Sequence, residues 1–517
     1  MKINKIIYIL LAFFVLNACT EDDLTVLPDG NELVETFYQT DEQIILALNG
    51  AYDPFQHVIW GGSTFLWGSI TSDDAVGGGG DENDQKGYQV CDRFLASPVE
   101  DKDVNLQDFY TLWWKMNTRA NAIIAYADIN SKLGSKAVAN AYFLKGMAYF
   151  QLTRMFGRMP IIDDIPGITS VYPRAESVDV TWDAAEGYLK EAIKLTTGGM
   201  GLDVQVDKST GYATLGSAQI LLGKIYLYRG KNADAIAVLE DLVNDGYYAL
   251  EPNFADVFDP ARVHGVESLF EINMTSKGAA SWDGAGNNGN AIATLVSPRC
   301  FSNNTQPLPD GIHMSGWGMN QPTQKLAAAF DDMNDVIRKE ATMLDTATIQ
   351  FMCDTAGVTT IWENVLTGFY DNKHSARQGY FVSATQVNQN LIVLRYSDAL
   401  LMLAEAHHLN GNDGKAQSYL NQVRTRVSLP DVTATGADLF TAIKRERQLE
   451  LALEGDRYFD LVRWGDAEKE LTGEDYDNNG ESYATGLPGK ASNGYFPIPQ
   501  AEINAYGDND YGQNEGY

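Results

Sequence analysis

The strongest constraint on the fold of this chain is a spacing of small and large residues that occurs twice. After Ala404, a glycine follows seven residues on, an alanine twelve on and a leucine sixteen on, and the same spacing also begins at Gly223. Small residues let two helices cross closely, and large residues fill the groove between successive helix pairs. This spacing is typical of tetratricopeptide repeats. The sequence therefore predicts helical hairpins around 222–239 and 403–420.

Apolar residues recur with the helical period in much of the chain, and they predict a mainly α fold. Leu400, Leu403, Ala404 and His407 form one such stripe, so His407 is expected in the core rather than in a metal site. Between 246 and 387 the helical period is mostly lost, and glycine, asparagine and proline are frequent. We therefore expect an α-solenoid scaffold of tetratricopeptide-like hairpins, with long irregular loops and a few short strands that form the ligand face.

Residues 1–18 have the features of a secretory signal peptide. Two lysines precede the apolar run Ile6–Leu16, which is too short to span a membrane as a permanent helix. The small residue Ala18 lies directly before Cys19, which is similar to the cleavage site of bacterial lipoproteins. We predict that Cys19 is lipidated and anchors the mature protein to a membrane. Ordinary secretion with an unmodified cysteine is the alternative.

Charge and cysteine content exclude several classes of protein. The formal net charge of −31 would repel nucleic acid and anionic lipid, so no nucleic-acid partner is expected. After the signal peptide, no apolar run is long enough to cross a membrane. Cys91, Cys300 and Cys353 allow at most one disulfide, and their spacing fits no zinc site. The sequence leaves open whether two of these three cysteines are paired.

Motifs that would indicate an enzyme are absent or out of context. The chain lacks HExxH and GxSxG, and the glycines of 284–289 have no evident strand and helix around them. Charged residues near the C-terminus are instead spaced as i, i+3 ion pairs. These pairs are Arg447/Glu450, Glu454/Arg457 and Asp460/Arg463. We interpret them as a structural network that holds the last helices to the body.

One stretch resembles the start of a calcium-binding loop. Asp475, Asp477 and Asn479 precede Gly480 with the spacing that such a loop requires. Position twelve is Gly486 rather than glutamate, so the bidentate ligand is missing. An ordinary turn is the preferred interpretation, and calcium is the alternative and the only cofactor that the sequence suggests.

A long run near the C-terminus has the pattern ER-x-x-E…EG-x-R-x-x-D-L-x-R-W. It is formed by Glu446, Arg447, Glu450, Glu454, Gly455, Arg457, Asp460, Leu461, Arg463 and Trp464. This run resembles the SusD/RagB family of outer-membrane nutrient-binding lipoproteins. The stretches 137–162 and 495–517 are also similar to the family. The resemblance implies a non-enzymatic protein that is lipid-anchored to the outer membrane and exposed on the cell surface. It would capture an oligo- or polysaccharide and deliver it to a SusC-like TonB-dependent transporter.

Two alternatives to glycan capture stay open. The alternatives are peptide uptake, as in another branch of the family, and a surface glycoside hydrolase.

By the same resemblance, residues 19–245 correspond to an N-terminal helical region with an inserted loop at 57–98. Residues 246–517 correspond to a C-terminal region with a loop-rich insert at 246–387 and helices at 395–464.

In the family, the ligand site lies on one face of the helical body and is formed by loops from both halves of the chain. The stretches 72–88 and 282–317 occupy the corresponding places here. Sugar rings have an apolar face that stacks on aromatic side chains, and their hydroxyls bind carboxylates and amides. By position, rather than by matched residues, the predicted ligand-binding residues are Trp317, Trp282, Tyr88, Asp74, Asp81, Asn83 and Gln85.

Overall fold

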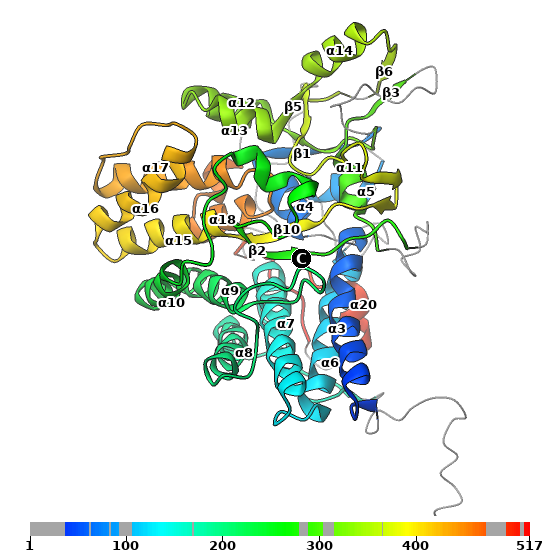
Figure 1. Ribbon diagram of the computed structural model, residues 1–517, viewed down its shortest axis with the longest axis vertical. Helices are drawn as coiled ribbons and strands as arrows, with labels where there is room; N and C mark the ends of the chain where they lie inside the picture. Colours follow the sequence, from blue (N-terminus) through cyan, green and yellow to red (C-terminus); the bar gives the residue numbers. More distant parts are fainter. Residues whose placement is uncertain are drawn as a thin grey trace, which may run out of the picture.

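Helices that follow one another along the chain lie side by side in this protein, as the computed structural model in Figure 1 shows. The structure describes residues 37–61, 64–81, 84–92, 106–167, 170–278, 288–302, 315–363, 365–471, 493–506 and 511–517. The long helices of the first half are α3 (Asp41–Gly61), α6 (Leu106–Tyr126), α7 (Lys132–Phe156), α8 (Val178–Thr197), α9 (Leu215–Tyr228) and α10 (Asn232–Asn244). The second half contributes α15 (Tyr396–Leu409), α16 (Asp413–Arg426), α17 (Gly436–Glu450) and α18 (Arg457–Trp464). The prediction of a mainly α fold is confirmed.

Small residues let the paired helices approach closely, as the repeat spacing predicts. A Cβ atom at Gly223 of α9 would lie 2.6 Å from the side chain of Leu239 on α10. A Cβ atom at Gly146 of α7 would lie equally close, 2.6 Å, to Leu189 on α8. In the third pair, α15 and α16, Ala404 and Leu420 are both fully buried. The predicted tetratricopeptide-like hairpins are therefore present, and close contact at small residues defines their packing.

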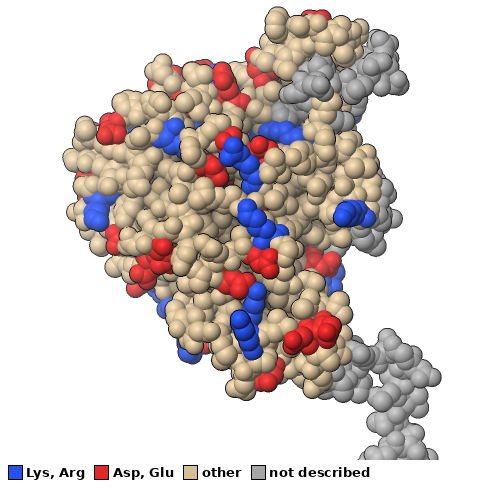
Figure 2. Space-filling model, in the orientation of Figure 1, with Lys and Arg blue, Asp and Glu red and all other residues tan. Residues whose placement is uncertain are grey.

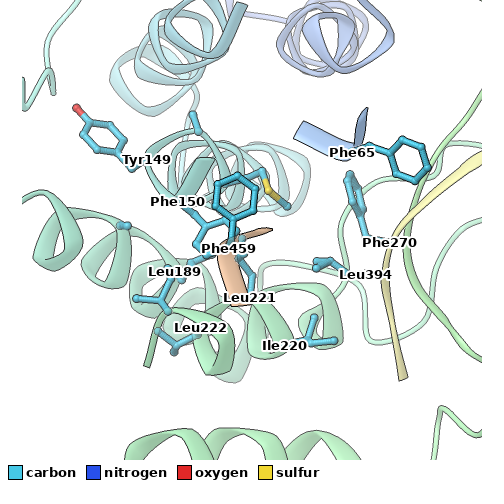
Figure 3. Packing of buried hydrophobic residues seen from close by; sticks show 14 of the residues in the cluster. Phe65, Tyr149, Phe150, Leu189, Ile220, Leu221, Leu222, Phe270, Leu394 and Phe459 are labelled. Carbon is cyan, nitrogen blue, oxygen red and sulfur yellow. The ribbon is translucent and has the colours of Figure 1, made fainter. Parts of the chain in front are cut away.

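One large apolar core joins the two halves of the chain. Phe150 of α7 and Leu221 of α9 point into it from the first half, and Phe459 of α18 enters it from the second (Figure 3). Phe65 of the short helix α4 (Thr64–Ile70) and Phe270 of a strand belong to the same cluster. Removing such large aromatic side chains from water is the main favourable contribution to folding.

Short antiparallel strands occur in pairs between the helices. Residues Ser268–Ile272 (β2) pair with Leu391–Arg395 (β10). This pair brings together the two ends of the loop-rich part of the chain just before α15 begins. Ala75–Gly78 (β1) pair with Met319–Pro322 (β4). The other pairs are β3 (Cys300–Ser302) with β6 (Thr360–Trp362), β5 (Met343–Asp345) with β7 (Phe369–Asp371), and β8 (Phe381–Ser383) with β9 (Gln386–Val387). The predicted few short strands are thus confirmed.

The remaining elements are short helices. Near β1 and β4 lie α5 (Lys86–Asp92) and α11 (Ala291–Val296), and α12 (Gln324–Asp332) follows β4. The others are α13 (Val336–Thr342), α14 (Thr346–Thr355), α19 (Ala467–Glu470), α20 (Gln500–Tyr506) and the 3₁₀ turns Phe254–Phe258 and Pro260–Arg262. In the described parts of the chain, no helix is both long and apolar enough to cross a membrane.

Buried ion pairs hold the C-terminal helices to the body, although only one of the three predicted local pairs forms. Arg463 lies 2.8 Å from Asp460, as predicted. Glu450 is bound instead by arginines from other elements, including Arg338 at 3.0 Å. Arg457 likewise reaches Asp73, far away in sequence, at 2.7 Å. The network interpretation is therefore correct, but most of its partners are distant in sequence.

The C-terminal tail closes the N-terminal half of the chain. Asn514 donates a hydrogen bond to the carbonyl oxygen of Phe156, at the end of α7, at 3.0 Å. Its side-chain oxygen accepts a hydrogen bond from Arg174 at 2.6 Å. The amide nitrogen of Phe496 also donates to the carbonyl oxygen of Met155 at 2.8 Å. The end of the chain is thus part of the first helical hairpins.

Candidate ligand-binding site

The two stretches predicted to carry the site come close together at the ladder between β1 and β4. The stretch 72–88 contains β1, and the stretch 282–317 ends just before β4. Ala75 lies opposite Pro322, and Gly78 lies opposite Met319. The amide nitrogen of Gly79 also donates a hydrogen bond to the carbonyl oxygen of Gly318 at 2.9 Å. A Cβ atom at Gly78 would lie 2.2 Å from that same oxygen, so only glycine permits this close approach. Loops from both halves of the chain are therefore held together here.

Trp317 lies next to this ladder and is half-buried. Part of its side chain packs against the main core. Its amide nitrogen donates to the carbonyl oxygen of Thr294 at 3.0 Å, which fixes the backbone that carries the indole. A tryptophan that is anchored on one side and accessible on the other can offer a rigid apolar surface to a ligand.

Polar side chains surround the ladder on the same part of the molecule. Asp81 is exposed and Gln85 is half-buried. Arg299 lies 3.3 Å from Asp84 and 3.1 Å from Glu363, so it links the β1 side to the chain that follows β6. Carboxylates, an amide and a guanidinium are the groups that bind sugar hydroxyls.

Sequence reasoning missed Arg299, Asp84 and Glu363. Asp84 lies within the predicted stretch 72–88, but several other acidic residues occur there, and nothing in the sequence distinguishes Asp84 from them. No local pattern marks Arg299, because its partners are far away in sequence. Only the folded chain brings these three residues together.

Two predicted ligand residues, Asp74 and Tyr88, are buried, and this part of the prediction is wrong. Asp74 is completely buried and accepts a hydrogen bond from Gln448 at 2.7 Å. Tyr88 is 1% exposed because α5 directs it into the core rather than into a loop. A side chain without accessible surface cannot contact a sugar in this conformation. Neither residue is therefore part of the accessible surface in this structure.

The buried pair of Asp73 and Asp74 has an asymmetric charge environment. Burial and the neighbouring Asp73 raise the pKa of Asp74 to about 6. The pKa of Asp73 is lowered to about 2, because Arg457 and Lys325 outweigh the effect of burial. The Oδ2 atom of Asp74 has no hydrogen-bond partner in the described part of the protein. Below about pH 6, a protonated Asp74 beside an ionised Asp73 fits this arrangement.

Several predicted residues lie outside the described parts of the chain. They are Cys19, Asn83, Trp282, Asp475, Asp477 and Asn479. Within the described parts, no group of three or more histidine, cysteine or acidic residues could hold a metal ion. His407 is buried and lies 3.2 Å from Glu240, in agreement with the expected core position. Cys300 and Cys353 are buried free thiols.

The face shown in Figure 2 carries no concentrated patch of one charge on its described residues. On the face shown in Figure 2, acidic and basic side chains are interspersed, and uncharged residues form most of the surface. A concentrated patch of one sign would favour a ligand of the opposite charge. The described residues on this face therefore do not favour a strongly charged ligand.

Comparison with known proteins extends over nearly the whole chain. The SusD family pattern matches residues 267–517. SusD-like protein P2 from Formosa agariphila is 25% identical, with 90% of this chain and 91% of the relative covered. A SusD-like protein from Bacteroides ovatus is 24% identical, with 89% and 82% covered.

Solved structures show the same architecture. A laminarin binding SusD-like protein has a TM-score of 0.77 and 28% identity, covering 93% of this chain and 100% of that one. Surface glycan-binding protein A from Bacteroides thetaiotaomicron, solved in complex with laminarihexaose, has a TM-score of 0.79 and 25% identity, with 93% and 100% covered. These names describe binding rather than catalysis, so the hydrolase alternative is not retained.

Proposed function

Since this chain belongs to the SusD family, we propose that it captures an oligo- or polysaccharide at the cell surface and delivers it to a SusC-like TonB-dependent outer-membrane transporter. One observation carries the proposal. The structures that resemble this chain over their whole length, at 25–28% identity, include proteins named for binding laminarin or solved with laminarihexaose. A neutral β-glucan of that kind is therefore the first ligand to test.

The proposed site is the surface around the β1–β4 ladder. Trp317 would stack on a sugar ring, while Asp81, Gln85 and Arg299 would bind hydroxyls. Trp282 and Asn83 stay in the proposed set by their place in the sequence. Capture and release require only shape, stacking and hydrogen bonds, so the site needs no general acid, nucleophile or metal.

The anchor is a separate part of the proposal. Residues 1–18 would be removed as a signal peptide, and Cys19 would carry lipid as the mature N-terminus. The binding body would then be held at the outer membrane by lipid. The division into regions 19–245 and 246–517 stays a proposal as well, and the shared core means that the two regions would fold together.

Substitution of Trp317 tests the site. A stack of a sugar ring on an indole contributes about 1–3 kcal/mol, so Trp317→Ala should weaken the binding of laminarihexaose by roughly ten- to a hundredfold. Isothermal titration measures the affinity, and the midpoint of thermal unfolding should change little. Tyr247→Ala is a matched control, because Tyr247 is another accessible aromatic residue, 45% exposed, in the segment after α10.

The outcomes of this titration separate the alternatives. Unchanged affinity in Trp317→Ala would remove Trp317 from the site. A large loss of thermal stability would identify it as a core residue. If the wild-type chain binds short peptides and none of the glycans, peptide capture replaces glycan capture as its function.

A further inference from the structure

A second cleft lies away from the β1–β4 ladder, between α3, α6 and the end of β2. Its volume is about 520 Å³, within the range of sites that hold a small ligand. The side chains of Phe55 and Phe270 form its buried floor. Tyr52 and Tyr212 line one wall and stack on each other with ring centroids 5.2 Å apart. Figure 1 shows α3 and α6 side by side.

Amide side chains in the cleft are fixed at one end and unused at the other. Asn273 accepts hydrogen bonds at Oδ1 from His264 at 2.7 Å and Asn390 at 3.0 Å. Asn49 accepts one from the Tyr212 hydroxyl at 2.5 Å. In both asparagines the Nδ2 donors have no partner in the described part of the chain.

Gln56 supplies the complementary group. Its Nε2 atom donates to the carbonyl oxygen of Asn273 at 2.9 Å, and its Oε1 atom has no partner among the described residues. The cleft thus offers oriented donors and an acceptor whose positions are set before a ligand arrives. Such preorganisation reduces the entropy lost on binding.

The charges that line the cleft are already compensated. Asp53 lies 2.8 Å from Arg119 on α6. Glu271 is buried and accepts hydrogen bonds from the amide nitrogen of His264 at 2.9 Å and from Asn390 at 3.0 Å. A charged ligand would have to compete with these partners. A neutral ligand with several hydroxyls could use the amides instead.

Gly50 keeps the cleft open. It lies inside α3, where alanine would favour the helix more than glycine does. A Cβ atom at Gly50 would meet no atom within 4 Å, so packing does not require glycine here. Pro54, one turn later, has no N–H to donate to the Gly50 carbonyl oxygen, and Arg119 donates to that oxygen instead. A side chain at Gly50 would enter the space beside these groups.

We propose that this cleft is a second saccharide-binding site, specific for a neutral oligosaccharide. The proposal rests on the glycan-binding function proposed above, but it uses none of the residues at the β1–β4 ladder. The amides would bind hydroxyls, and the tyrosine wall and phenylalanine floor would cover apolar faces of the sugar rings. Two sites on one chain would strengthen the retention of a long polysaccharide, because the second contact is made within the same complex.

A pair of glycine substitutions tests the cleft. Gly50→Leu fills it, whereas Gly187→Leu places the same side chain on α8, where a Cβ atom also meets nothing within 4 Å. Both variants of the full mature chain should unfold at or above the wild-type temperature, because leucine favours a helix over glycine. The probes for titration are laminarihexaose, maltohexaose, xylohexaose and mannohexaose, with a mixture of short neutral peptides as a comparison. Asn49→Ala gives a second measurement that does not fill the cleft.

The expected result is a loss of about tenfold or more in affinity for at least one hexasaccharide in Gly50→Leu and in Asn49→Ala. Gly187→Leu should bind as the wild type does, and Trp317→Ala should retain the binding event that Gly50→Leu loses. If Gly50→Leu and Gly187→Leu have the same affinity for every sugar, the cleft is not a saccharide site. If only Trp317→Ala loses sugar binding, the site at the β1–β4 ladder is supported and the second site is contradicted. If Gly50→Leu loses peptide binding instead, the assignment to saccharides is overturned. A wild-type chain that binds none of the four sugars would contradict both proposals.

Discussion

At the scale of single residues, the role of a residue could be predicted where its contacts lie close to it in the sequence. The small residues of the hairpins contact neighbours on the next helix, so their spacing in the sequence revealed their role. Asp74 stands in a run of polar residues that suggests exposure, yet Gln448 and Arg457 reach it from the other end of the chain. Tyr88 looked like a loop residue and is instead the buried side of α5. Burial of this kind arises from distant contacts, which no local pattern contains.

Asp74 gives a prediction about pH. In the unfolded chain its carboxyl group ionises near pH 4, and in the folded protein near pH 6, so wild-type stability should fall as pH rises between these values. Asp74→Asn removes that loss and should stabilise the protein by about 1–3 kcal/mol above pH 6, with little gain at pH 4. Urea unfolding at several pH values measures this difference.

Asp73→Asn is the opposite control for the same measurement. The pKa of Asp73 is lowered in the folded state, so its ionised form stabilises the protein above pH 4, and that stability is lost as pH falls toward 2. The variant should therefore be less stable than the wild type at neutral pH. Equal responses of the two variants would contradict the asymmetric charge environment.

At the scale of elements, the helical hairpins were predictable and the loops between them were not. A repeat uses the same contacts each time, so one spacing describes several helix pairs. The β1–β4 ladder has no such repeat, and its two strands lie more than two hundred residues apart. The family resemblance predicted that loops from these two parts of the chain form one site. Neither the ladder itself nor a neighbouring residue such as Arg299 could be predicted from the sequence.

The hairpin contacts predict opposite effects for one substitution at two glycines. Gly223→Ala would place a methyl group 2.6 Å from Leu239 and should destabilise the protein by about 1–3 kcal/mol through overpacking. Gly187→Ala meets open space and should stabilise it by about 0.5–1 kcal/mol, as expected for alanine in a helix. Thermal unfolding of both variants measures the difference. A stabilising effect at Gly223 would show that the helices do not need a small residue at this crossing.

At the scale of the whole molecule, the proposed anchor and the binding body are separable. Cys19→Ala should release the protein from the membrane fraction and leave its folding and its glycan affinity unchanged, because Cys19 precedes all the described elements. Fractionation followed by titration of the released protein measures both. Retention of the variant in membranes that also lack the transporter would show that something other than this lipid holds the protein.

The hydrogen bond from Asn514 to the end of α7 can form only after the chain between these two points has been made. Phe156 and Asn514 are separated by 358 positions, so the ribosome makes Asn514 long after it has made α7. The early hairpins can pair while the chain is still growing, but the end of α7 lacks its contact with Asn514 until that residue has been made. For an exported chain, both ends must therefore be on the same side of the inner membrane before folding is complete. The early hairpins can therefore form first, but the fold is complete only after Asn514 has been translocated.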